Sequence, residues 1–158
     1  MQRQPSMEAV LAKIKAAGVP IPPGPVTLGT YGDSEEPSQE LISLIIAGRK
    51  RAGTSLLWAY ETEEQPVPRP GDIEIVLDHR NEPRVIARIT GVAIEEFRNV
   101  SVEHAMIEGE GDGSLEHWRA AHWEAFGIEC ARLGREPRDD ILVVCSVFEV
   151  LKLLPKMP

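Results

Sequence analysis

The amino-acid sequence predicts an α+β domain in which helices flank a small curved sheet or barrel. Segments with helical spacing are interspersed with strand-like segments rich in β-branched residues, and they lack the regular strand–helix–strand rhythm of a parallel sheet. The chain has 158 residues, a length that one hydrophobic core can serve. We therefore expect one such domain.

Four segments have the features of helices, with apolar residues at helical spacing, a capping residue before them or a glycine after them. They are residues 6–18, 34–48, 101–109 and 114–127. Ser6 and Ser101 are the expected N-caps of the first and third helices. Gly127 is expected to end the fourth helix.

Four other segments read as strands because they are apolar and rich in β-branched residues. They are residues 54–60, 73–78, 84–94 and 141–154. Residues 79–83 between the second and third strands predict a hairpin loop, and the prolines of residues 19–26 enforce an extended connector.

The composition excludes several classes of protein. A formal net charge of -8 argues against a protein that holds duplex nucleic acid through many phosphate contacts. No apolar run is long enough for a membrane span, and residues 1–18 lack the features of a signal peptide. Cys130 and Cys145 do not make a disulfide framework, and we interpret them as buried thiols of a cytoplasmic protein.

The stretch "IEGEGDGSLEHW" carries the acidic residues of greatest interest. Glu108 falls in the last turn of a predicted helix, where the negative end of the helix dipole disfavours a carboxylate. A raised pKa there would suit a general base or acid. Taken alone, however, this position is better explained by a solvated surface glutamate. Glu110 and Asp112 follow between glycines, in a loop too short for an EF-hand. These two carboxylates predict a loosely held Mg²⁺ or Mn²⁺, although Asp112 or Ser114 could instead cap the next helix.

Two further groups of residues admit both a structural and a functional interpretation. Lys50 lies in the basic run "GRKR" between a helix and a strand, where it could complement the helix end or meet an anion or a substrate oxygen. Trp118, His122 and Phe126 share one helical stripe, so the two aromatic rings are expected to pack on the sheet, with His122 hydrogen-bonded at the core edge. No zinc motif and no Gly-x-Ser-x-Gly motif occurs in the sequence.

Three segments together, "AGRKRAGTSLLW", "RPGDIEIVLD" and "HAMIEGEGDGSLEHWRAAH", resemble the ASCH (ASC-1 homology) domains of the PUA-like superfamily. The chain looks most similar to a bacterial branch that carries "GDS", here residues 32–34, and later "EGEGD-SL-W". The resemblance covers residues 28–154 and implies a PUA-like β-barrel of about five to six strands with a cleft that faces RNA or a nucleotide. It divides the chain into an N-terminal helix and proline-rich connector (1–27) and an ASCH domain (28–158).

One branch of this family consists of amidohydrolases that act on N4-acetylcytidine through a Lys, a Thr and a Glu. The family Lys falls on Lys50, and the Glu falls on Glu108 through the motif "HA--E" that begins at His104. The family Thr lies three positions after the Lys, where this chain has Gly53. Thr54 would replace it only if the strand bulges at Gly53.

The same resemblance implies residues for holding a ligand. Arg49 and Arg51 are expected to meet phosphate, and Trp58 or Trp118 to stack on a base of single-stranded RNA. Arg119, next to Trp118, completes the predicted ligand-binding set.

Three hypotheses for function follow. The first is an RNA-binding protein that hydrolyses single-stranded RNA with the help of a metal ion, as other members of the family are described to do. The second is a binding module for RNA or a nucleotide without catalysis. The third is an amidohydrolase of N4-acylated cytidine that uses Lys50, Thr54 and Glu108. Residues 1–27 could pack on the barrel or mediate a homodimer.

Overall fold

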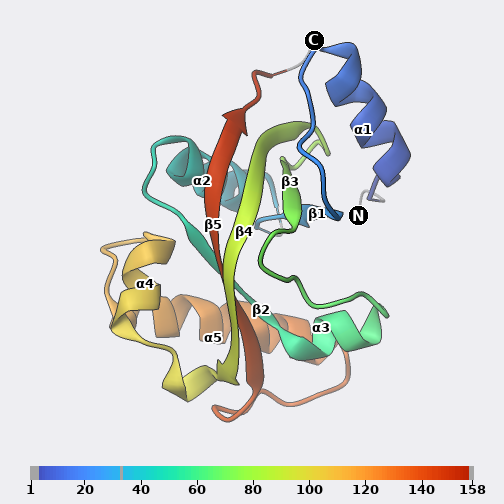
Figure 1. The fold of residues 1–158 in the computed structure, drawn as a ribbon. Coiled ribbons are helices and arrows are strands. Elements are labelled where there is room, and N and C mark those ends of the chain that lie inside the picture. Colours follow the sequence, from blue (N-terminus) through green and yellow to red (C-terminus); the bar gives the residue numbers. More distant parts are fainter. Residues whose placement is uncertain (1–3, 33, 157–158) are drawn as a thin grey trace.

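The computed structural model describes residues 4–32 and 34–156, so Asp33 of the predicted "GDS" motif lies outside the described residues. Its strands form one curled sheet in the order β1-β3-β4-β5-β2 (Figure 1). The strands are β1 (Val26–Thr30), β2 (Ala52–Leu56), β3 (Ile73–Leu77), β4 (Pro83–Glu96) and β5 (Leu142–Leu153). The helices are α1 (Met7–Ala16), α2 (Glu35–Ile46), α3 (Leu57–Thr62), α4 (Val102–Glu108) and α5 (Leu115–Arg132), with a 3₁₀ turn η1 (Phe97–Asn99).

The two long strands β4 and β5 form the spine of the sheet and pair antiparallel along most of their length. Their register shifts between Ile86 and Ala87 and again between Ile89 and Gly91, and such irregularities bend a sheet. The fold is therefore the α+β domain with a curved sheet that the sequence predicts, and its five strands agree with the small barrel that the resemblance implies.

Separate apolar clusters attach the helices to this sheet. Val10 and Ile14 of α1 are buried with Ile73 and Ile75 of β3, so the N-terminal helix packs on the sheet. At the other end, Trp118 and neighbouring residues of α5 bury their side chains against β2 and β5. Among the described residues, no helix has the length and apolar character required to cross a membrane.

Two expectations about secondary structure are wrong, and one strand was missed. The strand predicted for residues 54–60 ends at Leu56, and the chain continues as α3, whose Trp58 and Ala59 pack on the core cluster. A run of bulky apolar residues signals burial without distinguishing a strand from a short helix. Gly127 does not end α5, because the apolar stripe continues from Phe126 to the buried Cys130 one turn later. Strand β1 was not predicted, because it is short and follows prolines, and it depends on parallel pairing with the distant β3.

Other predictions are confirmed. The side chains of Ser6 and Ser101 accept hydrogen bonds from backbone N–H groups in the first turns of α1 and α4. Ser114, one of the two candidates for α5, is its N-cap and accepts a hydrogen bond from the N–H of His117. These caps start α4 and α5 on either side of the acidic loop, and so they position that loop.

Candidate active site

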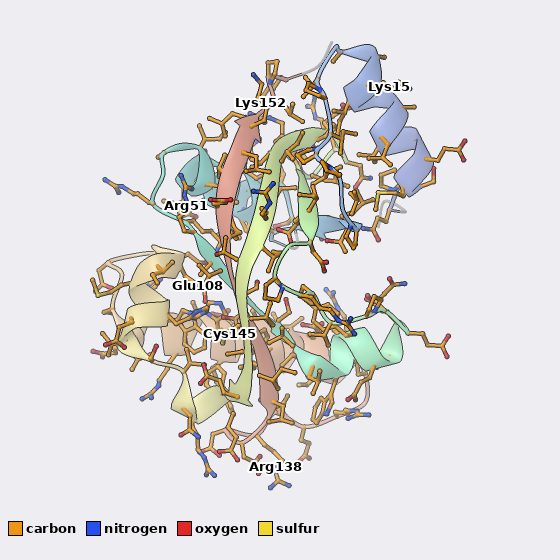
Figure 2. All side chains as sticks on the ribbon, viewed as in Figure 1. Lys15, Arg51, Glu108, Arg138, Cys145 and Lys152 are labelled. Atoms are coloured by element: carbon orange, nitrogen blue, oxygen red, sulfur yellow. The ribbon has the colours of Figure 1, made fainter. Side chains whose placement is uncertain are left out.

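Lys50 and Glu108 form a buried ion pair, with 3.1 Å between Lys50 Nζ and Glu108 Oε1. Their side chains are only 2% and 1% exposed. Lys50 lies just before β2, and Glu108 is the last residue of α4. The Arg51 N–H donates a hydrogen bond to the carbonyl of Ile107 over 2.9 Å, which ties the start of β2 to the end of α4. Figure 2 shows Glu108 between α4 and the central strands.

The second carboxylate oxygen of Glu108, Oε2, also lies close to several hydrogen-bond donors. Thr54 Oγ1 donates a hydrogen bond to Glu108 Oε2 over 2.7 Å, and the indole N–H of Trp118 donates to the same oxygen. His104 Nε2 lies 3.2 Å from Oε2, and His122 Nε2 lies 3.4 Å from Oε1. One buried carboxylate thus meets donor groups from β2, α4 and α5 as well as Lys50, which satisfies the requirement that a buried charge be paired.

These contacts reverse the expected titration of Glu108. Burial alone would raise its pKa, but hydrogen bonds from His104 and His122 and the charge of Lys50 outweigh burial. The pKa of Glu108 therefore lies well below its ordinary value, and the raised pKa expected from the helix dipole is wrong. The dipole is a small effect beside several direct donors.

Glu110 and His122 border the pair and are partly exposed. Glu110 Oε2 lies 3.3 Å from Lys50 Nζ, so the ammonium group is held between two carboxylates. Burial raises the pKa of Glu110, and the negative charge of Glu108 adds to this effect, while Lys50 opposes it. For His122, burial lowers the pKa, but the hydrogen bond and charge of Glu108 outweigh it and the pKa is raised.

A proton NMR titration can check this coupling. We expect the His122 imidazole to titrate above its ordinary pKa of 6.5, since Glu108 stabilises the charged ring. Because the folded state raises this pKa, the stability that His122 contributes is fully present below about pH 6.5 and is lost as the pH rises through the folded-state value. In Glu108→Gln the His122 midpoint should fall. An unchanged midpoint in that variant would show that Glu108 does not control the imidazole.

Thr54 reaches Glu108 without the strand irregularity that the sequence suggested. Strand β2 pairs with β5 in unbroken register, Gly53 opposite Ser146 and Thr54 opposite Cys145. The bulge at Gly53 that was set as a condition for Thr54 to replace the family Thr is therefore not needed for Thr54 to reach Glu108. Lys50 precedes the strand, so its side chain is placed by the bend after α2 rather than by strand alternation.

Gly109 allows the end of α4 to approach the segment before β2. Its φ is +68°, and a Cβ built there would lie 2.3 Å from the carbonyl oxygen of Arg49. Gly113 has a similar φ of +77° but no atom within 4 Å of such a Cβ, so it is a matched control. We expect Gly113→Ala to cost about 1 kcal/mol of unfolding free energy and Gly109→Ala about 3 kcal/mol, measured by urea denaturation. Equal losses would contradict the tight approach at Gly109.

Comparison with known proteins identifies the family. The family model described as "ASCH domain" matches residues 27–152. The chain belongs to the ASCH domain family. No curated protein sequence matches it.

Solved structures support the same assignment of this ASCH domain. An ASCH domain from Lactobacillus crispatus JV V101 is 30% identical with a TM-score of 0.77, and the alignment covers 90% of this chain and 92% of that one. A protein from Enterococcus faecalis V583 is 31% identical with a TM-score of 0.76, and the alignment covers 92% of this chain and 88% of that one.

The three arginines predicted to bind a ligand in this ASCH domain differ in their exposure and in their hydrogen-bond partners. Arg49 and Arg119 are exposed, and Arg119 donates a hydrogen bond to the carbonyl of Arg98. Arg51 donates to the carbonyls of Ile45 and Lys50, so its guanidinium group supports the end of α2. Their roles toward phosphate stay predictions.

Trp58 and Trp118, which were predicted to stack on a base, both already have ring or cation contacts within the protein. Trp118 is 2% exposed, and its ring stacks on Phe97 at 5.3 Å and on His122 at 4.3 Å between centroids. Trp118 thus stacks on two rings of the protein, and its indole N–H donates to Glu108. Trp58 lies on α3 beneath the guanidinium group of Arg135, 4.2 Å from its ring centroid.

The acidic loop fits a metal ion poorly. Asp112 is exposed and accepts a hydrogen bond from the N–H of Ser114, which lowers its pKa. The oxygen and nitrogen atoms that could share an ion belong to Glu108, Glu110 and His122, and they lie within 4.8 Å of one another. The Lys50 ammonium already occupies the space between the two carboxylates and supplies positive charge there. A divalent ion at this cluster would share the two carboxylates with the ammonium group of Lys50.

Sequence reasoning missed several residues of this cluster. His104 was noticed only as part of a motif, yet its Nε2 lies 2.9 Å from Thr54 Oγ1. Tyr31 was not considered, although its ring lies 5.5 Å from Lys50 Nζ and its hydroxyl donates to Glu74 over 2.7 Å. A usable signal was present for Glu74, the one charged residue within the apolar strand "IEIVL".

Proposed function

We propose that this ASCH domain is an amidohydrolase that cleaves the N-acyl bond of an N4-acylated cytidine. The observation that supports this proposal most directly is the contact of Thr54 Oγ1 with Glu108 Oε2 at 2.7 Å, while Lys50 Nζ lies 3.1 Å from the other carboxylate oxygen. A hydroxyl nucleophile, a carboxylate base and an adjacent cation are the groups that acyl transfer requires.

In the first step, Thr54 Oγ1 attacks the acyl carbonyl carbon, and its proton moves to Glu108 Oε2. The C–N bond then breaks, and the departing cytidine nitrogen takes that proton. The lowered pKa keeps Glu108 ionised at neutral pH but makes it a weak base, so the proton moves as the new C–O bond forms and the Thr54 oxygen becomes acidic.

In the second step, water attacks the ester on Thr54 and gives its proton to Glu108. Collapse of the intermediate returns the proton to Thr54 and releases the carboxylic acid. Lys50 donates two of its three N–H bonds to Glu108 and Glu110, which leaves the third for the developing oxyanion. The sum is one amide and one water converted to one acid and one amine.

The test is the release of cytidine from N4-acetylcytidine by purified protein in EDTA, followed by liquid chromatography. We expect turnover in EDTA for the wild-type chain and its loss in Lys50→Met, which removes the cation but keeps the length of the side chain. Serial dilution of the enzyme should lower the rate in proportion. Absence of cytidine at high enzyme concentration would refute the proposal.

Metal-assisted cleavage of single-stranded RNA is the second candidate. It is supported by membership of the ASCH family and by the proximity of the donor atoms of Glu108, Glu110 and His122. Mg²⁺ or Mn²⁺ bound there would share the two carboxylates with the ammonium group of Lys50. Labelled single-stranded RNA incubated with Mn²⁺ or EDTA distinguishes the two functions. Cleavage that needs Mn²⁺ and is lost in Glu110→Gln would favour this candidate, and saturable binding without product would favour a binding module.

A further inference from the structure

Glu74 is a carboxylate in a place that normally excludes one. It lies on β3 between Ile73 and Ile75, both 0% exposed, and Val76 and Leu77 after it are equally buried. A charged group on such a strand is unfavourable unless it has a partner or a role that compensates for lost hydration. Glu74 is itself partly exposed, unlike the neighbouring residues of the strand.

Tyr31 connects Glu74 to the Lys50–Glu108 pair. The Tyr31 hydroxyl donates to Glu74 Oε1 over 2.7 Å, and the ring centroid lies 5.5 Å from Lys50 Nζ. Lys50 in turn contacts Glu108 at 3.1 Å. The row of side chains from Glu74 through Tyr31 to Lys50 thus ends at the groups proposed to cleave the acyl bond.

Two glycines of the sheet make room for this row. A Cβ on Gly29 of β1 would lie 2.8 Å from Glu74 Cδ, too close for any side chain unless Glu74 moved. A Cβ on Gly53 of β2 would lie 3.4 Å from a ring carbon of Tyr31. The backbone on both sides therefore leaves space where larger residues would press on Glu74 and Tyr31.

The hydrogen-bond donors and acceptors of Tyr31 and Glu74 indicate which kind of ligand could bind beside them. Burial raises the pKa of Glu74, while Tyr31 and Lys50 oppose that rise. The ionised carboxylate offers acceptors only, and the protonated carboxyl offers a donor beside an acceptor. Either form can accept from the N4–H of a cytosine, and the protonated form can also donate to N3. The protonated form would pair equally well with N3–H and O4 of uracil. Only the ionised form, which accepts from N4–H of cytosine and faces O4 of uracil unfavourably, distinguishes the two bases.

We propose that Tyr31 and Glu74 form a base-binding subsite beside Lys50 in which the ionised Glu74 carboxylate accepts a hydrogen bond from the N4–H of a cytosine. This subsite rests on the proposed function, because it orients the N4-acyl group toward Thr54 and Lys50. Tyr31 fixes the carboxyl group of Glu74 through its hydroxyl, and the two glycines leave room for the side chains of Glu74 and Tyr31.

The experiment measures binding of cytidine and uridine to the full chain by isothermal titration calorimetry, separately from turnover. We expect cytidine to bind roughly tenfold more tightly than uridine, a discrimination typical of one good hydrogen bond. Glu74→Leu should weaken cytidine binding by about tenfold or more, and Tyr31→Phe by a smaller factor. Glu74→Gln, which keeps an acceptor beside a donor, should stay within about threefold of the wild type.

Controls separate folding from recognition. Glu149→Leu removes an exposed carboxylate from β5, two strands away from β3, and should leave cytidine binding unchanged. If Glu74→Leu unfolds, the double variant Tyr31→Phe/Glu74→Leu removes the hydroxyl left without an acceptor, and the same weakening is expected.

Failure of the subsite and failure of the proposed function give different results. Cytidine binding that is absent in the wild type, or unchanged in Glu74→Leu and the double variant, would overturn the subsite even if N4-acetylcytidine is hydrolysed. Cytidine binding that depends on Glu74 without any turnover would uphold the subsite and refute the amidohydrolase.

Discussion

Thr54→Ala is expected to reduce hydrolysis of N4-acetylcytidine by about 10³-fold or more, since it removes the atom proposed to attack the carbonyl. The loss should appear in kcat, with cytidine affinity little changed, because Thr54 is 2.7 Å from Glu108 and is not part of the base-binding subsite. Thr54→Ser, which keeps the hydroxyl, should recover a substantial part of the rate. Initial rates measured by liquid chromatography give these values.

Ser55→Ala is the matched control for Thr54→Ala. Ser55 is the next residue of β2, so its side chain projects from the face of the strand opposite to that of Thr54. There it forms a hydrogen bond with Tyr60. Its loss should leave the rate within about threefold of the wild type, as for a surface change that does not touch the chemistry. Equal rates for Thr54→Ala and Ser55→Ala would show that Thr54 is not the nucleophile.

Glu108→Leu is expected to cause the largest loss of stability. It leaves the buried Lys50, 2% exposed, without its main counter-charge. It also leaves the hydrogen-bond donors of Thr54, Trp118 and His104 without their acceptor. Breaking a buried ion pair by removing one partner costs roughly 3–5 kcal/mol, so urea denaturation should show a loss of that size. Activity should fall with it, since Glu108 is the proposed base.

The double variant Lys50→Met/Glu108→Leu tests the physical origin of that loss. It replaces both charges with apolar groups, and we expect it to be more stable than Glu108→Leu alone. Glu103→Leu, an exposed position on the same helix α4, should change the unfolding free energy by less than about 1 kcal/mol. A loss below about 1 kcal/mol for Glu108→Leu would contradict a buried, charge-dependent cluster.

The sequence predicts the fold well where signals are local. Helix caps such as Ser101 and strands such as β3 follow from patterns a few residues long. Strand β1 depends on parallel pairing with a distant segment, so local patterns did not predict it. The length of α5 depends on the packing of Cys130, so local patterns predicted a helix that ends too early.

The site was predicted only in part for the same reason. Glu108 and Lys50 were selected because a family resemblance joins two distant segments. The local rule that Glu108 breaks did not select it on its own. The donors that set the pKa of Glu108 are close in space rather than in sequence, so the direction of its pKa shift was predicted wrongly. Tyr31 reaches Lys50 across the sheet, a contact that no spacing rule describes.

A crystal structure of the Thr54→Ala variant with N4-acetylcytidine tests the central claim most directly, because the variant should hold the substrate without cleaving it. We predict the acyl carbonyl carbon over the position vacated by Thr54 Oγ1, its oxygen toward Lys50 Nζ, and the cytosine edge against Glu74. A ligand bound elsewhere, with Lys50 and Glu108 untouched, would contradict the assignment of this cluster as an active site.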